Sequence, residues 1–276
     1  MYMSHNTDAE VNLFWTGGWD STFRLLYLVF VEKKSVQPFY IADTGRPSTL
    51  HELRAMHVIK EEVAKRDPQL ANLIKPTIIV SVHDIKPDPE ITAKFNRLRE
   101  KLHIGSQYDW LARFAKQWKI QNLELSIHKG DHTYDLLSKH ITDFELCIEQ
   151  SERAPNILKN LLSPYMNDNL KLKQFDENDD VSIFSFFRFP LLKLSKNDMK
   201  RIAAENGFLD ILEKTWFCHK PWHGRPCGTC VPCNIAIKEG LSYRIPKISR
   251  FRRKIWIIIR HFVKIKEKVG QLLRRS

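Results

Sequence analysis

Apolar residues in the first two thirds of the chain form short runs that alternate with longer segments of helical spacing. Helical spacing predicts helices over residues 23–31, 48–65 and 108–118. Runs rich in Val, Ile and aromatic residues predict strands at 11–15, 36–42, 76–82, 123–127 and 181–187. Strands that alternate with helices favour an α/β fold with a doubly wound, mostly parallel sheet.

Composition divides the 276 residues into three parts. We expect a main domain over residues 1–190, a short helical and cysteine-rich segment over 191–243, and a basic helical tail over 244–276. Within the first part, residues 151–180 are rich in Asn, Asp and Lys, which predicts a loop-rich insertion. Parallel sheets bind ligands at the carboxyl ends of their strands, so chemistry is expected there.

A glycine loop lies between the first predicted strand and the first predicted helix. Residues 16–22 read Thr-Gly-Gly-Trp-Asp-Ser-Thr. Glycines permit close backbone approach, and a helix N-terminus offers free N–H groups and partial positive charge, which suit phosphate. The loop lacks the Gly-Lys ending of a Walker loop. The alternative is a tight turn in which Asp20 and Ser21 only cap the helix.

Four of the five cysteines fall within sixteen residues. Cys218, Cys227, Cys230 and Cys233 are separated by eight, two and two residues. Four thiolates complete the tetrahedral shell of structural zinc, and the intervening glycines and prolines suit a tight knuckle. An iron–sulfur cluster or a thiol redox pair are the alternatives. We expect the fifth cysteine, Cys147, in the core.

Two motifs resemble those of a known family. The glycine loop resembles the Ser-Gly-Gly-x-Asp-Ser motif of PP-loop ATP pyrophosphatases, with Thr16 in place of the leading serine. The segment from Cys218 through the Cys-Gly-Thr-Cys-Val-Pro-Cys run at 227–233 is similar to the zinc motif of the 7-cyano-7-deazaguanine synthases of queuosine biosynthesis. The Asp-Thr-Gly-Arg run that ends at Arg46 resembles the segment of that family where adenosine is expected.

The resemblance implies a carbon–nitrogen bond-forming ligase that adenylates a small carboxylate or amide, releases pyrophosphate and lets ammonia attack the acyl-adenylate. It implies Mg²⁺ as a cofactor and Zn²⁺ held by the four cysteines. The residues it assigns to ATP are Thr16, Gly17, Gly18, Asp20, Ser21, Thr22 and Arg46.

The acceptor half of the chain departs from that family. The family's Arg-Asn and Tyr-Pro-Asp-Cys-Arg stretches are missing, and residues 105–110 and 126–133 stand in the corresponding region. We therefore expect the activation chemistry that the resemblance implies, with a small carboxylate as the acceptor and a 7-deazaguanine as one option. Lys129 and Asp131 follow a predicted strand, and we predict them as catalytic residues, with Lys129 stabilising charge on the α-phosphate. The alternative for each is a solvated loop residue.

The positive charge belongs to the tail. The chain carries a net charge of +12, and residues 244–276 hold twelve Lys and Arg with one acid, Glu267, so the remainder is nearly neutral. Apolar residues recur in the tail at helical spacing, which predicts a basic amphipathic helix. Packing on the body and contact with an anionic membrane surface are weighed equally, with RNA third.

Location and function keep alternatives open. The sequence shows no secretory signal, and its apolar run at 255–259 is far shorter than the roughly 20 residues of a membrane span, so we expect a cytoplasmic protein, with the inner membrane face as a peripheral site. The alternatives to a ligase are a PP-loop tRNA-modifying enzyme and a non-catalytic, membrane-docked module that binds ATP.

Overall fold

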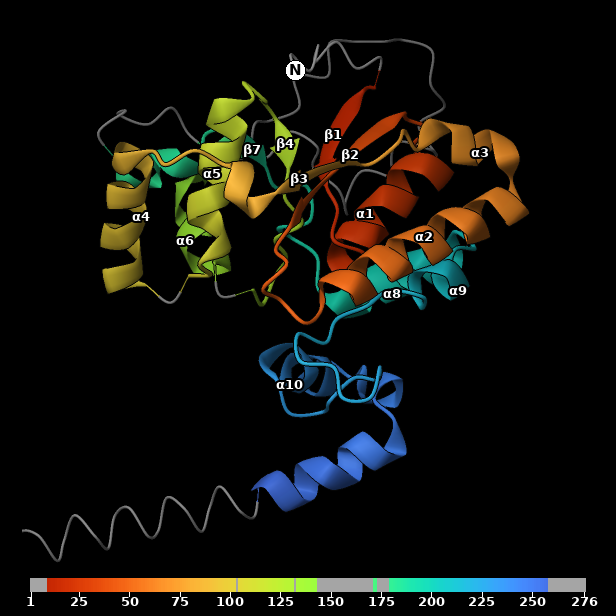
Figure 1. The fold of residues 1–276 in the computed structure, drawn as a ribbon. Helices are drawn as coiled ribbons and strands as arrows, with labels where there is room; N and C mark the ends of the chain where they lie inside the picture. Colours follow the sequence, from red (N-terminus) through yellow and green to blue (C-terminus); the bar gives the residue numbers. More distant parts are fainter. Residues whose placement is uncertain (1–8, 103, 132, 143–170, 173–178, 258–276) are drawn as a thin grey trace, which may run out of the picture.

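A five-stranded parallel sheet forms the centre of the computed structural model, which describes residues 9–102, 104–131, 133–142, 171–172 and 179–257 (Figure 1). The strands stand in the order β3-β2-β1-β4-β7, and every pairing is parallel. The expected α/β fold with a parallel sheet is confirmed. The strands are β1 (Val11–Phe14), β2 (Val36–Ala42), β3 (Ile78–Ser81), β4 (Leu123–Glu124) and β7 (Phe187–Arg188).

Helices follow the strands along the chain. The described α-helices are α1 (Trp19–Phe30), α2 (Thr49–Arg66), α3 (Pro68–Leu73), α4 (Pro89–Lys101), α5 (Gln107–Gln117), α6 (Tyr134–His140), α8 (Lys196–Glu205), α9 (Leu209–Leu212) and α10 (Val231–Lys238). Short 3₁₀ turns stand at η1 (Val82–Asp84), η2 (Asp180–Phe184) and η3 (Ser242–Arg244). A small antiparallel pair joins β5 (Ile141–Thr142) to β6 (Lys171–Leu172).

The core has two halves, one on each face of the sheet. In β2, Tyr40 packs with α1, α2 and α8, whereas its neighbours Phe39 and Ile41 pack with α4 and α5. This follows from the two-residue period of a strand, which turns successive side chains to opposite faces. The first six of the seven residues of β2 are buried, as expected for an inner strand of a parallel sheet.

Two features differ from the sequence-based expectation. The run 181–187 is not a strand: η2 covers Asp180–Phe184, with the Asp179 side chain accepting from the Val181 N–H at 3.0 Å, and only Phe187–Arg188 pair with β4. The helices α3 and α4 were not predicted. Both begin at an Asp-Pro pair whose aspartate accepts helix N–H groups, a start signal that the apolar pattern did not use.

Several expectations lie partly or wholly outside the described residues. These are the position of Cys147, the insertion at 151–180 apart from β6 and residues 179–180, and the tail beyond residue 257. In the described part of the chain, no helix has both the length and the apolar character needed to cross a membrane.

A buried ionic network ties α1 to the sheet. Arg24 is fully buried, and its guanidinium donates to both carboxylate oxygens of Glu124 in β4, at 2.7 and 2.9 Å. A third donor of the same guanidinium reaches Glu32 at 2.7 Å. Bidentate pairing satisfies both charges where water is excluded.

Replacing Arg24 by Met should therefore lower the free energy of unfolding by about 3–5 kcal/mol, because the buried Glu124 carboxylate loses its bidentate cationic partner. Urea unfolding measures this. The double variant Arg24→Met/Glu124→Leu should lose less than Arg24→Met alone, and Lys65→Met, which breaks the exposed pair with Glu62, should leave stability unchanged. Equal losses for the single and double variants would contradict the network.

Candidate functional site

The glycine loop turns the chain from β1 into α1 at the carboxyl edge of the sheet. Gly17 has φ +67°, and a Cβ at this position would lie 2.8 Å from the Glu52 carbonyl oxygen of α2. The Gly17 carbonyl accepts from the Trp216 N–H at 2.8 Å. Only glycine can occupy a position with this conformation and this crowding.

The polar side chains of the loop bond largely to one another. Ser21 Oγ accepts from the Thr16 N–H at 3.2 Å and lies 3.3 Å from Thr16 Oγ1. Thr22 Oγ1 accepts from Trp15 Nε1 at 2.9 Å and is buried. Gly18 stands at the N-cap of α1 with no side-chain cap, so the N-terminal turn keeps N–H groups for a ligand.

A cavity of about 460 Å³ opens beside this loop. Its wall includes Thr16, Gly18 and Asp20 from the loop and Arg46 from the segment after β2. Other lining residues come from α5 and from the segment that holds the four cysteines, residues 216–233, called the cysteine segment below. Its volume lies within the range of roughly 300–1,000 Å³ typical of small-molecule sites.

A smaller cavity of about 160 Å³ shares part of that wall and extends toward β4 and α5. Apolar side chains such as Tyr108, Leu111 and Ile127 line it together with Ser126 and Asp131. The Ser126 hydroxyl is buried and has no hydrogen-bond partner among the described residues, so it can offer a hydrogen bond beside an apolar surface.

Charged side chains surround Asp20 where the cavities meet. One Asp20 oxygen lies 3.8 Å from His128 Nε2 and 3.9 Å from Lys196 Nζ, and Lys196 also pairs with Glu239 at 2.9 Å. Burial disfavours the charged form of Lys196, but Asp20, Glu239 and Asp131 outweigh it and raise its pKa. Lys196 therefore presents a positive charge to the larger cavity at neutral pH.

A second charged group, Arg46, also lines the larger cavity. Arg46 donates to Glu52 at 2.8 Å, and the Tyr40 hydroxyl donates to the other Glu52 oxygen at 2.7 Å. Burial and the Glu52 carboxylate raise the pKa of Tyr40, so its hydroxyl stays protonated. Glu52 thus orients Arg46 and Tyr40 toward the cavity that both line.

The residues predicted from the sequence are only partly brought together. Thr16, Gly18, Asp20 and Ser21 line one or both cavities, as does Arg46. Gly17 and Thr22 act through the loop backbone and the packing of α1. Asp131 lines the smaller cavity and accepts from the Thr133 N–H at 2.8 Å.

Lys129 is differently placed from Asp131. Its side chain is exposed, its N–H donates to the Leu194 carbonyl at 2.8 Å, and it is absent from the described lining of both cavities. Sequence reasoning did not assign Tyr40, Trp216 or Glu239 to the site. Tyr40 could have been assigned because it lies near the carboxyl end of a predicted strand, where ligands bind. No feature of the sequence indicates that Glu239 lies near Asp20.

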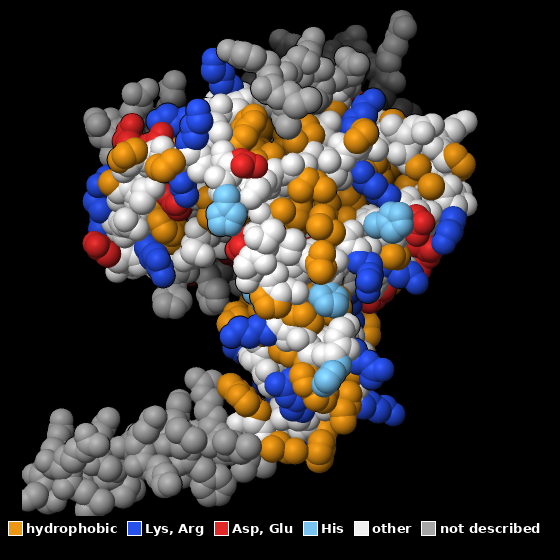
Figure 2. All heavy atoms as spheres, in the orientation of Figure 1, with side chains coloured by type: hydrophobic (Ala, Val, Ile, Leu, Met, Phe, Trp, Pro, Cys, Tyr) orange, Lys and Arg blue, Asp and Glu red, His pale blue; other side chains and the backbone are white. Residues whose placement is uncertain are grey.

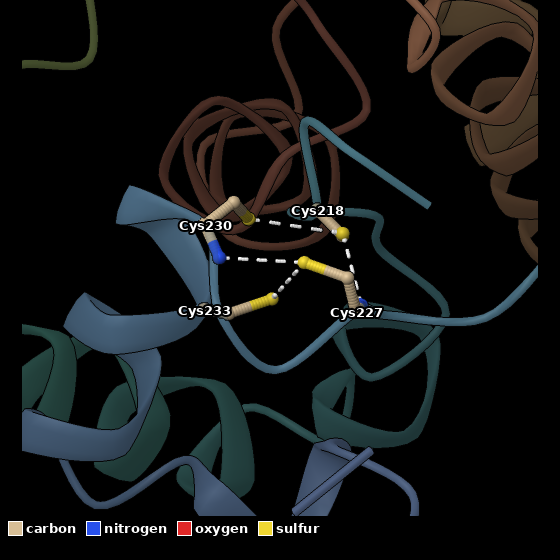
Figure 3. A group of neighbouring side chains, drawn as sticks. All are labelled: Cys218, Cys227, Cys230 and Cys233. Carbon is tan, nitrogen blue, oxygen red and sulfur yellow. Dashed lines mark hydrogen bonds between the residues drawn. The ribbon is translucent and has the colours of Figure 1, made fainter. Parts of the chain in front are cut away.

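The four cysteine sulfurs point toward one another and can hold a metal ion (Figure 3). All four lie within 4.8 Å of each other, with Cys218–Cys230 at 3.8 Å and Cys227–Cys233 at 3.9 Å. Sulfurs placed 2.3 Å from a central zinc ion at tetrahedral corners are about 3.8 Å apart. The observed separations therefore match a tetrahedral tetrathiolate site.

Backbone geometry builds this cluster from three short pieces. Cys218 precedes a tight turn in which His223 and Gly224 both have positive φ and Trp222 bridges to Arg225. Cys227 follows the turn. Cys230 caps α10, so it and Cys233 lie one helical turn apart and face the same side.

Backbone N–H groups donate to two of the sulfurs. Cys227 Sγ accepts from the N–H groups of Thr229 and Cys230 at 3.4 and 3.3 Å, and Cys218 Sγ accepts from the Cys227 N–H at 3.2 Å. Hydrogen bonds from Cys218 and Cys233 lower the pKa of Cys230, while the bond to Cys230 raises the pKa of Cys218 to about 12. A cation at the centre would allow all four to ionise.

The cysteine segment also forms one wall of the larger cavity. Trp216, His219 and Pro232 line it, and the Trp216 ring stacks on His51 of α2 with centroids 4.4 Å apart. Burial and the nearby Arg46 charge lower the pKa of His219. The cluster therefore supports residues that face the candidate ligand site.

No protein-family model matches this chain, and no curated protein matches it.

The Gly17→Ala variant should lose more stability than Gly207→Ala. Both positions have positive φ, for which a side chain costs about 1–2 kcal/mol, but a Cβ at 207 meets no atom within 4 Å, whereas at 17 it meets backbone. Urea unfolding of the two variants measures the difference. Equal losses would contradict the close packing of the loop against α2.

Metal analysis tests the cysteine cluster. The purified chain should hold one zinc ion, and Cys227→Ser should lose it together with thermal stability, since small zinc sites contribute on the order of 10 kcal/mol to folding. Elemental analysis and thermal unfolding are the measurements. Cys147→Ser is the matched control and should keep the metal; unchanged metal content in Cys227→Ser would refute the site.

Proposed function

We propose that this chain is an ATP-dependent adenylating enzyme with a doubly wound PP-loop fold, similar in chemistry to the 7-cyano-7-deazaguanine synthases. The observation that carries the proposal is the position of the glycine loop. It follows β1, the central strand of the order β3-β2-β1-β4-β7. The sheet continues from β1 to β2 and β3 on one side, and to β4 and β7 on the other. Open parallel sheets bind nucleotides at such a point.

The larger cavity suits a nucleotide in shape and charge. The N-terminal turn of α1 offers N–H groups to phosphate, and Lys196 and Arg46 add positive charge to the lining of the cavity. Trp110 and Trp216 offer aromatic surface to the base.

The residues also suit the cation that accompanies ATP. Asp20 Oδ1 is buried and has no hydrogen-bond partner among the described residues, and a carboxylate oxygen is a ligand that Mg²⁺ prefers. We infer that Asp20 holds Mg²⁺, which would neutralise phosphate charge when bound. The four cysteines hold zinc in a structural role.

The proposed reaction has two steps. A carboxylate oxygen of the acceptor attacks the α-phosphorus of ATP, the bond between the α-phosphorus and the bridging oxygen breaks, and pyrophosphate leaves. Ammonia then attacks the acyl carbon, AMP leaves with the bonding electron pair, and an amide forms. Lys196 is better placed than the exposed Lys129 to stabilise negative charge at the phosphates.

Product analysis tests the proposal directly. The zinc-loaded chain with ATP, Mg²⁺ and ammonium should release AMP and pyrophosphate when given 7-carboxy-7-deazaguanine or another small carboxylate. Release of ADP would exclude cleavage between the α and β phosphates. ATP binding without turnover on any carboxylate would reject the ligase and direct the search to tRNA acceptors and the non-catalytic alternative.

The Asp20→Asn variant should form AMP on the order of a hundredfold more slowly, because an amide keeps the shape of the side chain but not its charge. Rates of AMP formation and urea unfolding are measured together. Asp135→Asn, an exposed aspartate absent from the described lining of both cavities, is the control and should keep the full rate. Full activity in Asp20→Asn would contradict the assigned role.

A further inference from the structure

The residues after η3 form a helix that extends away from the α/β body (Figure 1). This tail helix comprises residues 247–257 in the described part of the chain. The helix has large apolar side chains that remain exposed: Phe251 is 61% exposed, Ile248 48% and Ile255 44%. An apolar surface of this kind calls for a partner.

Three of the exposed apolar residues share one face, whereas Trp256 and Ile257, which are also exposed, lie at other positions around the helix. Ile248, Phe251 and Ile255 stand at positions i, i+3 and i+7, which at 100° per residue fall within about 60° of the helix circumference. Arg250 and Lys254 are exposed in the adjacent sector. The outward face is therefore an apolar stripe beside a basic one.

The neighbouring side of the helix, which carries Ser249 and Arg252, attaches it to the cysteine segment. Ser249 is fully buried. Its carbonyl oxygen lies so close to Gly228 that a Cβ added to that glycine would be 2.7 Å from it. The Arg252 guanidinium lies 4.9 Å from the centre of the Trp222 ring, and Ile245 packs with Cys218, Cys227 and Cys233. These contacts fix which side of the helix faces outward.

Charge identifies the partner. Residues 247–257 contain five Lys and Arg and no acid, and no Asp or Glu occurs between 240 and 266. A second copy of the same face would bring these like charges together. RNA would neutralise them but leave the stripe of Ile and Phe in water. An anionic bilayer surface satisfies both stripes, since acyl chains accept the apolar residues and headgroups accept the cations.

We propose that the outward face of the tail helix docks the protein on an anionic lipid membrane. Ile248, Phe251 and Ile255 enter the interface, and Arg250 and Lys254 contact the headgroups. Figure 2 shows orange and blue side chains side by side at this end of the molecule. The proposal does not depend on the adenylating activity, because it concerns a surface that lies outside both cavities.

Co-sedimentation of the full chain with vesicles tests the proposal, without ATP. The chain should bind phosphatidylcholine vesicles that contain phosphatidylserine, bind at least tenfold more weakly to phosphatidylcholine alone, and dissociate as salt rises. Phe251→Ser/Ile255→Ser should weaken binding at least tenfold. Leu50→Ser, which changes an exposed apolar residue of α2, should not.

A second set of double variants tests the role of the basic residues by replacing them with Glu. Arg250→Glu/Lys254→Glu should weaken binding to the anionic vesicles at least tenfold, whereas Arg54→Glu/Lys119→Glu, at exposed positions of the body, should bind like the unchanged chain. Circular dichroism and metal content verify that each variant is folded.

Three results would overturn the proposal. One is vesicle binding that persists in Phe251→Ser/Ile255→Ser or is equal on neutral lipid. Another is that the chain does not bind vesicles but binds a labelled single-stranded RNA, and that this RNA binding requires Arg250 and Lys254. The third is self-association that Phe251→Ser/Ile255→Ser abolishes, again without vesicle binding, which would assign the face to a second copy.

Discussion

The backbone at Gly17 is the point on which the candidate site depends. Its Cα faces the Glu52 carbonyl of α2 with no room for a side chain, and its own carbonyl binds the Trp216 N–H. Sheet, second helix and cysteine segment therefore meet at one residue. Because both contacts are made by backbone, they set how far apart the walls of the larger cavity stand, whatever side chains line it.

The cysteine cluster has a second consequence beyond binding a metal. Trp216 and Pro232, close to Cys218 and Cys230 in the chain, line the larger cavity. Ile245, just before the tail helix, packs with the cysteines, and Ser249 within that helix is buried. One small knuckle thus supports the wall of a ligand site and the base of an exposed amphipathic helix. A segment this short has little core of its own, and a metal held by the four cysteines would supply the missing stability.

Charges inside the body are arranged in pairs from distant parts of the chain. Arg24 meets Glu124 beneath the sheet, and Lys196 meets Glu239 and Asp20 at the cavity. Burial of charge is tolerated only where a partner is present. In the tail helix, by contrast, Lys247, Arg250 and Lys254 are exposed. The two arrangements are consistent with the two proposals above, a small charged ligand in the body and an anionic surface at the tail helix.

Local features were determined by the sequence alone. The short β-branched runs specified most strands, and the four-cysteine spacing specified a cluster whose sulfurs do come together. The Asp-Pro starts of α3 and α4 carried a helix signal that apolar spacing missed. Such signals can be found in the sequence because strand formation, helix capping and the knuckle turns depend on residues a few positions apart.

Only the tertiary structure decided which distant residues share the site. Lys129 follows β4 as expected but is exposed, whereas Lys196, far along the chain, faces Asp20 in the cavity. The run that begins at Val181 turns into η2 because Asp179 caps it and its apolar side chains fill the core beside α4 and α5. Such choices depend on packing and charge between elements that local sequence does not encode.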